Sequence, residues 1–161
     1  MLSNRPQTKK GFTIIEVVLA AALLSSFFMS IALYYVRALH VTEQTTHYIQ
    51  SSFILEEGIE ALKGQRDLGW SANIASLANG TTYYLYWSGT NWTTTTTPYK
   101  IENYYDRSFV LSAVNRDASD NISSSGTLDT GIRKITMTVS WYGKSGTTTR
   151  SVEAYIANLF E

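Results

Sequence analysis

The sequence predicts an α+β fold in which a long N-terminal helix packs by its second half on a C-terminal antiparallel sheet. Three observations predict it. Residues 12–36 form an apolar run long enough to span a membrane, and residues 37–64 continue it with apolar side chains at helical spacing. Later segments alternate between apolar and polar residues, as strands with one buried face do. We therefore expect four segments: 1–11 a positively charged stretch, 12–36 a transmembrane helix, 37–64 its amphipathic continuation, and 65–161 a β-rich head.

The composition indicates which classes of function to expect. The 161 residues carry 13 basic and 13 acidic side chains, so no direct binding to nucleic acid is expected. The chain has no cysteine and only two histidines, which excludes a disulfide framework and leaves little for a nucleophilic triad. We expect no enzyme activity, and assign no catalytic, cofactor-binding or metal-binding residue.

The N-terminal run has the properties of a membrane span. At about 1.5 Å per residue, residues 12–36 would extend about 37 Å as a helix, against a hydrocarbon core of about 30 Å. The basic residues lie before it, Lys9 and Lys10 among them, so the N-terminus is expected in the cytoplasm and residues 37–161 outside the membrane. The run is too long for an ordinary cleaved secretory signal, and no small-x-small cleavage site ends it.

Glu16 is the one charged residue of this run. A carboxylate in a bilayer is costly, and an acid at such a position is a functional hypothesis by default. Two interpretations are open at this point. Glu16 could be paired with a cation of another molecule, or it could reach the cytoplasmic interface, because it lies close to the start of the helix.

The residues around Glu16 resemble the processing site of type IV prepilins and of type II secretion pseudopilins. The string is Lys9-Lys10-Gly11-Phe12-Thr13-Ile14-Ile15-Glu16, followed by the apolar run. The resemblance implies that a prepilin peptidase cuts between Gly11 and Phe12, and that the new terminal residue, Phe12, becomes N-methylated. It also implies that Glu16 sets the register of assembly and that Lys9 and Lys10 belong to the removed leader.

The same resemblance implies a pilin-like fold and a structural role. The partners would be the prepilin peptidase, other pilin or pseudopilin subunits, the assembly platform, and the lipid bilayer before assembly. The protein would first be a single-pass inner-membrane protein and then part of an extracellular or periplasmic filament. The head lacks a cysteine pair, unlike major pilins, which favours a minor subunit. Residues 55–63, followed by 65–67 and 69–70, resemble sequences of minor, PilV-like proteins. Motility, adhesion, DNA uptake and secretion all stay open, and the alternative function is a signal-anchored binding domain that does not polymerise.

The second half of the helix is predicted from spacing. Tyr48, Leu55, Ile59 and Leu62, with Ser52 between the first two, recur every three or four residues and form one stripe. No proline interrupts residues 37–64, and Gly64 is a plausible stop. Gly58 lies inside the run, where glycine costs about 1 kcal/mol relative to alanine. The stripe is expected to cover one face of a sheet.

The head is predicted to contain at least three or four antiparallel strands. Residues 81–87 are rich in aromatic and β-branched side chains, and residues 107–114 alternate, with Phe109, Leu111 and Ala113 expected on one face. Residues 135–142 alternate most clearly, and a turn at 143–146 leads into a last strand that holds Val152, Ala154 and Ile156. The opposite face, rich in Thr and Ser, is expected to be solvated.

The remaining stretches are predicted to be polar connections. They are the threonine run 93–97 and the segment 118–131. His40, Glu43 and His47 lie at helical offsets, but no further ligand supports a metal there, so we interpret them as surface residues. The segment Asn115–Asn121 faintly resembles the opening of a calcium loop, and an ordinary turn is the favoured interpretation.

Overall fold

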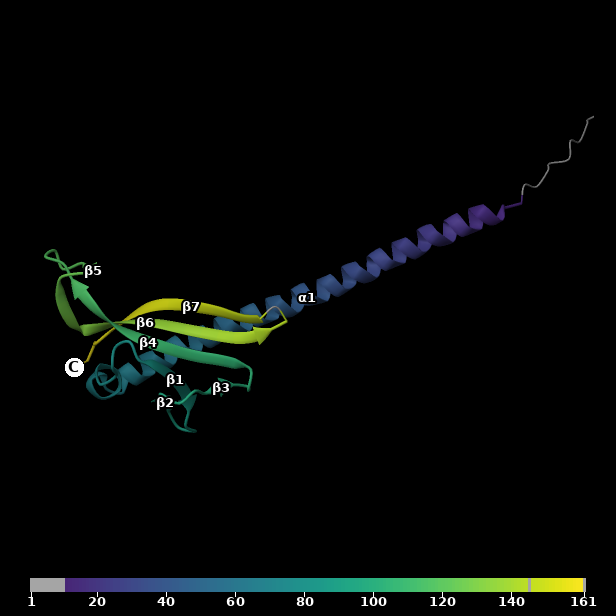
Figure 1. Cartoon of the computed structure of the whole chain (residues 1–161). Coiled ribbons are helices and arrows are strands. Elements are labelled where there is room, and N and C mark those ends of the chain that lie inside the picture. Colours follow the sequence, from purple (N-terminus) through teal and green to yellow (C-terminus); the bar gives the residue numbers. More distant parts are fainter. Residues whose placement is uncertain (1–10, 145, 161) are drawn as a thin grey trace, which may run out of the picture. The chain divides into compact units, whose positions relative to one another are not determined.

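The computed structural model describes residues 11–144 and 146–160 of the chain. It divides into two compact units, Met1–Thr46 and His47–Glu161. One helix, α1 (Ile14–Asp67), contributes to both units, and a short π-helix, η1 (Ser71–Ala75), follows it (Figure 1). The helix therefore ends three residues beyond Gly64, the stop predicted from the sequence.

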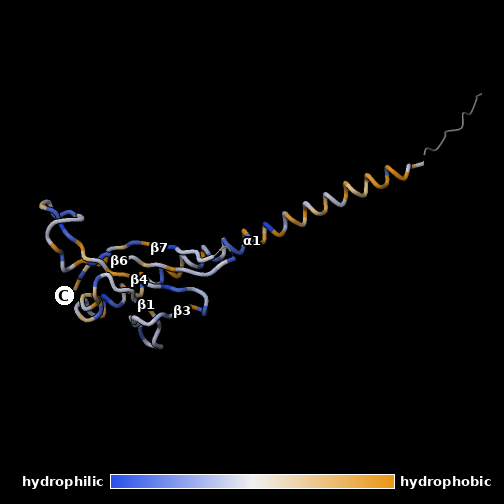
Figure 2. The backbone as a smooth tube through the Cα atoms, in the orientation of Figure 1, coloured by the Kyte–Doolittle hydropathy of each residue, from blue (hydrophilic) through white to orange (hydrophobic). Residues whose placement is uncertain are grey.

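The part of α1 in the first unit is a helix of exposed apolar side chains. Figure 2 shows the hydrophobic colouring that dominates its first half. The serine hydroxyl groups donate to backbone carbonyls one turn earlier in the helix: Ser25 donates to the carbonyl of Ala21, and Ser30 to the carbonyl of Ser26. Because these bonds stay within the helix, the serines add little polar cost to an apolar surrounding.

The second unit contains a single antiparallel sheet, which confirms the α+β class. Its main strands follow the order β2-β1-β4-β6-β7, and two short strands also pair with β4. The bounds are β1 (Thr82–Trp87), β2 (Trp92–Thr95), β3 (Lys100–Ile101), β4 (Tyr105–Arg116), β5 (Ile122–Ser123), β6 (Thr127–Gly143) and β7 (Gly146–Ala157). The predicted hairpin between the last two strands is confirmed, with Gly143 opposite Gly146.

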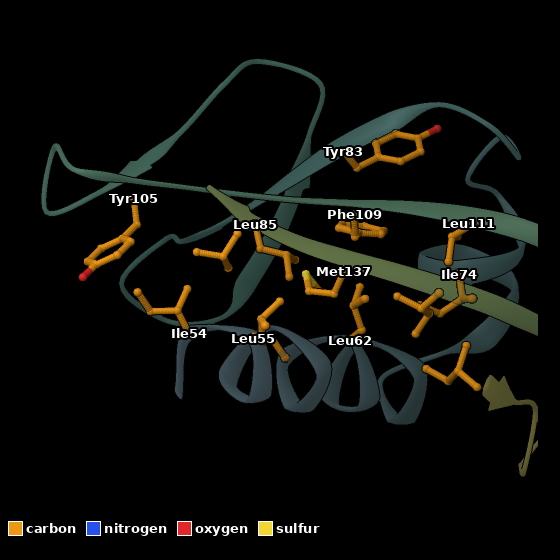
Figure 3. Packing of buried hydrophobic residues seen from close by; sticks show 14 of the residues in the cluster. Ile54, Leu55, Leu62, Ile74, Tyr83, Leu85, Tyr105, Phe109, Leu111 and Met137 are labelled. Carbon is orange, nitrogen blue, oxygen red and sulfur yellow. The ribbon is translucent and has the colours of Figure 1, made fainter. Parts of the chain in front are cut away.

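The core lies between the sheet and the C-terminal part of α1 (Figure 3). The helix buries a face that differs in part from the predicted stripe. Leu55 and Leu62 are buried as expected, but Tyr48 and Ser52 are exposed. The other buried helix residues are Ser51, Ile54, Gly58, Ala61 and Gln65. The prediction that Tyr48 and Ser52 belong to the buried face was therefore wrong. It considered mainly large apolar side chains, whereas small and polar residues also face the sheet.

Gly58 shows why that contact is so close. A Cβ at this residue would stand 2.9 Å from Cε of Met137 and 3.0 Å from Cδ of Arg107. Both side chains come from the sheet and both are buried. The glycine that weakens the helix by propensity therefore allows α1 to approach β4 and β6.

A bulge changes the alternation of β4. Tyr105, Phe109 and Leu111 are buried, but Ala113 is exposed and Val114 is buried in its place. The pairing with β6 shifts register here: Ala113 lies opposite Arg133 but Val114 lies opposite Asp129, so residues 130–132 of β6 have no partner on β4. Such an irregularity moves the following side chains to the other face. The prediction that Ala113 shares the face of Phe109 and Leu111 is therefore wrong.

Two segments predicted as polar connections contain strands. Thr93–Thr95 belong to β2, where Thr95 lies opposite Tyr84 of β1. The segment 118–131 includes β5 and the beginning of β6. Both corrections have one cause. β2, β5 and the first residues of β6, which precede its pairing with β7, lie at the periphery of the sheet, where solvated side chains give no alternating pattern.

Candidate functional site: the N-terminal end of the helix

Gly11 and Phe12 lie outside the helix, immediately before it. Phe12 is 88% exposed, and Gly11 is exposed as well. Apart from its chain neighbours, no heavy atom of the described chain lies within 4 Å of where a Cβ of Gly11 would stand. Nothing in the described fold requires a glycine at this position, and the backbone between the two residues is open to solvent.

Glu16 lies in the first turn of α1 and bonds back to Thr13, the residue before the helix. The backbone N–H of Thr13 donates to Glu16 Oε2 at 2.8 Å, and the Thr13 hydroxyl donates to the same oxygen at 3.0 Å. This is one half of a capping box, in which an acid three residues into the helix satisfies a free backbone donor. The T-x-x-E spacing could have indicated Thr13 from the sequence, and our sequence reasoning missed it.

The two bonds use one oxygen of the carboxylate. Within the part of the chain that the structure describes, Glu16 Oε1 accepts no hydrogen bond. An ionised carboxylate has about four acceptor positions, so the cap and a further donor are compatible. Lys9 and Lys10, the predicted leader residues, lie outside the described residues.

The helix that follows this site could cross a membrane. It contains an 18-residue window of mean hydropathy 2.2, and none of that window is buried. This supports, by length and composition, a single apolar span near the N-terminus.

The second unit contains a polar and aromatic cluster that the sequence did not indicate. His47 Nδ1 lies 2.7 Å from the hydroxyl of Tyr105, and that hydroxyl donates to Gln50 Oε1 at 2.6 Å. The His47 ring also stacks on Tyr104, with centroids 5.0 Å apart. Burial raises the pKa of Tyr105, so its hydroxyl keeps its proton at neutral pH.

Arg107 is a second feature that the sequence did not indicate. Its side chain is 2% exposed, beneath α1, and Nη1 lies 3.2 Å from Glu57 Oε2 and 3.2 Å from the carbonyl of Ile54. The guanidinium also lies over the Trp92 ring, 5.0 Å from the centroid. Nε is buried without a hydrogen-bond partner among the described residues. Burial lowers the pKa of Arg107, and the nearby Glu57 opposes that shift.

The carboxylate of Asp117 accepts hydrogen bonds from backbone groups of its own loop. Asp117 Oδ1 accepts the backbone N–H groups of Ser119 and Asn121, and these bonds lower the pKa of the carboxyl, with the bond from Asn121 the larger cause. Next to it, Arg116 Nε donates to Asp129 at 2.6 Å. A shallow groove of about 510 Å³ lies between this loop and the start of β6. The loop is an Asx-type turn, as favoured from the sequence.

In the described part of the chain, no three His, Cys, Asp or Glu side chains come together as metal ligands would. His40 and Glu43 form an exposed contact of 3.8 Å, and His47 belongs to the tyrosine cluster instead.

Comparisons with protein-family models, curated proteins and solved structures find no match for this chain. The function must therefore be argued from the residues themselves.

Proposed function

We propose that the protein is a structural subunit, of the minor kind, of a type IV pilus or a type II secretion pseudopilus. A prepilin peptidase would cut between Gly11 and Phe12, Phe12 would be N-methylated, and the apolar helix would leave the inner membrane to join a filament. The observation that carries the proposal is the position of Glu16, the one charge of residues 12–36, four residues after Phe12 in a string that begins with two basic residues and Gly11.

The geometry of Gly11 supports the cleavage step. A side chain at this position would meet nothing in the described fold, so the glycine has no role there that the fold explains. Cleavage would explain why residue 11 is a glycine, because a protease must bring the scissile bond into a narrow site. The exposed, non-helical backbone at Gly11 and Phe12 is also the kind of segment that proteases cut.

The free oxygen of Glu16 supports the assembly step. Cleavage would give Phe12 an ammonium group, which methylation keeps charged. An ammonium of a neighbouring subunit could bind Oε1 while Oε2 keeps the cap of its own helix. Such a pair would offset the cost of an unpaired acid, which reaches about 2.5–3.5 kcal/mol at the centre of a bilayer on insertion scales, and it would set the register between helices.

The test of cleavage is mass spectrometry of the full chain made together with an active prepilin peptidase. We expect a mature chain that begins with methylated Phe12. Gly11→Val should keep the whole leader, and the matched control Gly64→Ala, at a second glycine with no neighbour near its Cβ position, should be cut normally. An uncut parent chain would refute the proposal.

The test of assembly is the variant Glu16→Ala, scored by filament incorporation. Removing the acid lowers the cost of the span, so the variant should insert at least as well as the parent and still fail to assemble. Glu56→Ala, at an exposed acid later in the same helix, is the control and should assemble normally. Normal incorporation of Glu16→Ala would contradict the pairing role.

One observation favours the alternative, a signal-anchored binding domain that does not polymerise. Glu16 already accepts two hydrogen bonds from Thr13 of its own chain. It therefore caps the start of α1 without needing a second subunit. This alternative expects an uncut N-terminus, a monomer after extraction in detergent, and no effect of Glu16→Ala beyond helix fraying.

A further inference from the structure

The sheet has a second face, which points away from α1. Along β6, the buried residues Met137 and Val139 belong to the core under the helix, so Thr138 between them points to the other side. We call this side the open face; its residues are those of β1, β2, β4, β6 and β7 that alternate with the residues facing the helix. Their burial is intermediate or lower along the three longest strands, so the open face is accessible.

One row of the open face crosses all five main strands. Its members are neighbours in the strand pairing and each carries a hydroxyl group: Thr95, Tyr84, Ser108, Thr138 and Ser151. Neighbouring strands lie about 4.8 Å apart, so the row extends over about 19 Å. Within the described chain, one hydrogen bond engages these hydroxyls, from the Thr97 backbone N–H to Thr95 Oγ1 at 3.1 Å. The other four hydroxyls are left to solvent or to a ligand.

Further tyrosines lie on the open face around this row. Tyr86 follows Tyr84 on β1, and its ring centroid lies 6.0 Å from that of Tyr99. Tyr142 at the end of β6 and Tyr155 on β7 are 74% and 53% exposed. A tyrosine combines an apolar ring with a polar tip, so these residues offer flat apolar surface beside the hydroxyls.

The charged side chains of the open face are paired with one another. Lys134 Nζ lies 2.7 Å from Glu153 Oε1, and Lys100 Nζ lies 3.5 Å from Asp106 Oδ2. Because each cation has an acid beside it, these pairs leave no excess charge of either sign. Long-range attraction of a charged ligand requires such an excess, so this surface favours an uncharged one.

We propose that the open face binds an uncharged polysaccharide, laid across the strands along the row of hydroxyls. A sugar ring has an apolar side of C–H groups and a rim of hydroxyls, which complement the tyrosine rings and the row. An extended row of about 19 Å matches a chain of sugars better than a single sugar. Since α1 covers the opposite face, binding concerns the head alone and needs no cleavage between Gly11 and Phe12.

The test is equilibrium binding of the full chain to beads coated with a polysaccharide, in a detergent without a sugar headgroup. Three coatings are uncharged (hydroxyethyl cellulose, galactomannan and dextran), and the fourth, alginate, is polyanionic. We expect binding to at least one uncharged coating. It should persist in about 1 M NaCl, where the Debye length falls to about 3 Å. Failure to bind any uncharged coating, or binding to alginate alone, would overturn the proposal.

Two variants with matched controls test the face itself. Thr138→Val removes one hydroxyl from the middle of the row and keeps a β-branched side chain that strands accept. It should weaken binding about 2- to 10-fold, as the loss of one hydrogen bond does. The control Thr148→Val lies opposite Trp141 on the helix-covered face and should bind like the parent.

Tyr84→Ala removes a ring as well as a hydroxyl and should weaken binding more than Thr138→Val. Its control is Phe53→Ala, at a ring of α1 that is 65% exposed. Urea unfolding of each variant separates loss of binding from loss of the fold. If folded Thr138→Val and Tyr84→Ala bind as tightly as their controls, the open face is not the binding surface and the proposal is wrong.

Discussion

Replacing Arg107 by methionine should leave the stability of the head almost unchanged, although Arg107 is one of its most buried residues. The guanidinium has three partners: Glu57, the carbonyl of Ile54 and the ring of Trp92. Burial nevertheless lowers the pKa of Arg107, which means that the fold disfavours its charged form relative to water. Methionine keeps most of the volume and removes the charge.

The expected gains and losses nearly cancel. The substitution removes a buried Nε without a partner, which costs about 1–3 kcal/mol in the parent. It loses a hydrogen bond worth about 1 kcal/mol, a cation–π contact worth about 1–2 kcal/mol, and an ion pair worth less than about 1 kcal/mol because Glu57 is 48% exposed. We therefore expect the free energy of unfolding of Arg107→Met to lie within about 1–2 kcal/mol of that of the parent.

Arg107→Ala provides the contrast, because it removes the same charge and also the volume. Because a cavity would be left beneath Gly58 and beside Met137, the free energy of unfolding of Arg107→Ala should fall by about 3 kcal/mol or more. The measurement is urea unfolding of the full chain in detergent, followed by tryptophan fluorescence. If Arg107→Met unfolds as easily as Arg107→Ala, the charge stabilises this core and the reasoning is wrong.

Three further predictions concern the head. Gly58→Ala should destabilise it by about 1–2 kcal/mol, because overpacking exceeds the gain in helix propensity, whereas Gly64→Ala, with open space around it, should raise the midpoint of urea unfolding. Tyr105→Phe should cost about 1–3 kcal/mol in the same assay, because it leaves two part-buried polar groups without the hydroxyl they share. The Arg116 side chain lowers the pKa of Asp129 in the folded state, so its stabilising effect is present above the ordinary aspartate pKa of about 3.9 and is lost as the pH falls through the lower folded value. Protection factors from amide hydrogen exchange, which correct for the intrinsic pH dependence of exchange, should therefore fall selectively at the start of β6 in acid and stay constant between pH 5 and 8.

The candidate site could be found from the sequence because it depends on neighbours along the chain. Gly11, Phe12 and Glu16 lie within six residues, and the apolar run begins among them. Even Thr13, which we missed, has a local signal in its spacing from Glu16. The assembly role of Glu16 stays a prediction, because it concerns a contact with another molecule.

Features that depend on distant residues were missed or misplaced. Arg107 has an ordinary place in an alternating strand, and only its position under α1 makes it a buried cation. His47 meets Tyr105 across 58 residues of chain, a pairing that no local pattern indicates. The buried face of α1 was shifted for the same reason, since Ser51 and Gly58 are buried by what lies opposite them.

Periodicity and hydropathy along the chain determined by themselves that this protein has one long helix with an apolar first half and the strands β1, β4, β6 and β7, because these properties are set by residues a few positions apart. Only the tertiary structure decided how close α1 comes to the sheet, where the pairing of β4 with β6 shifts register, and which strand is left as the long open edge. Those features follow from which side chains meet after the chain has folded back on itself, and the distances involved are absent from any local pattern.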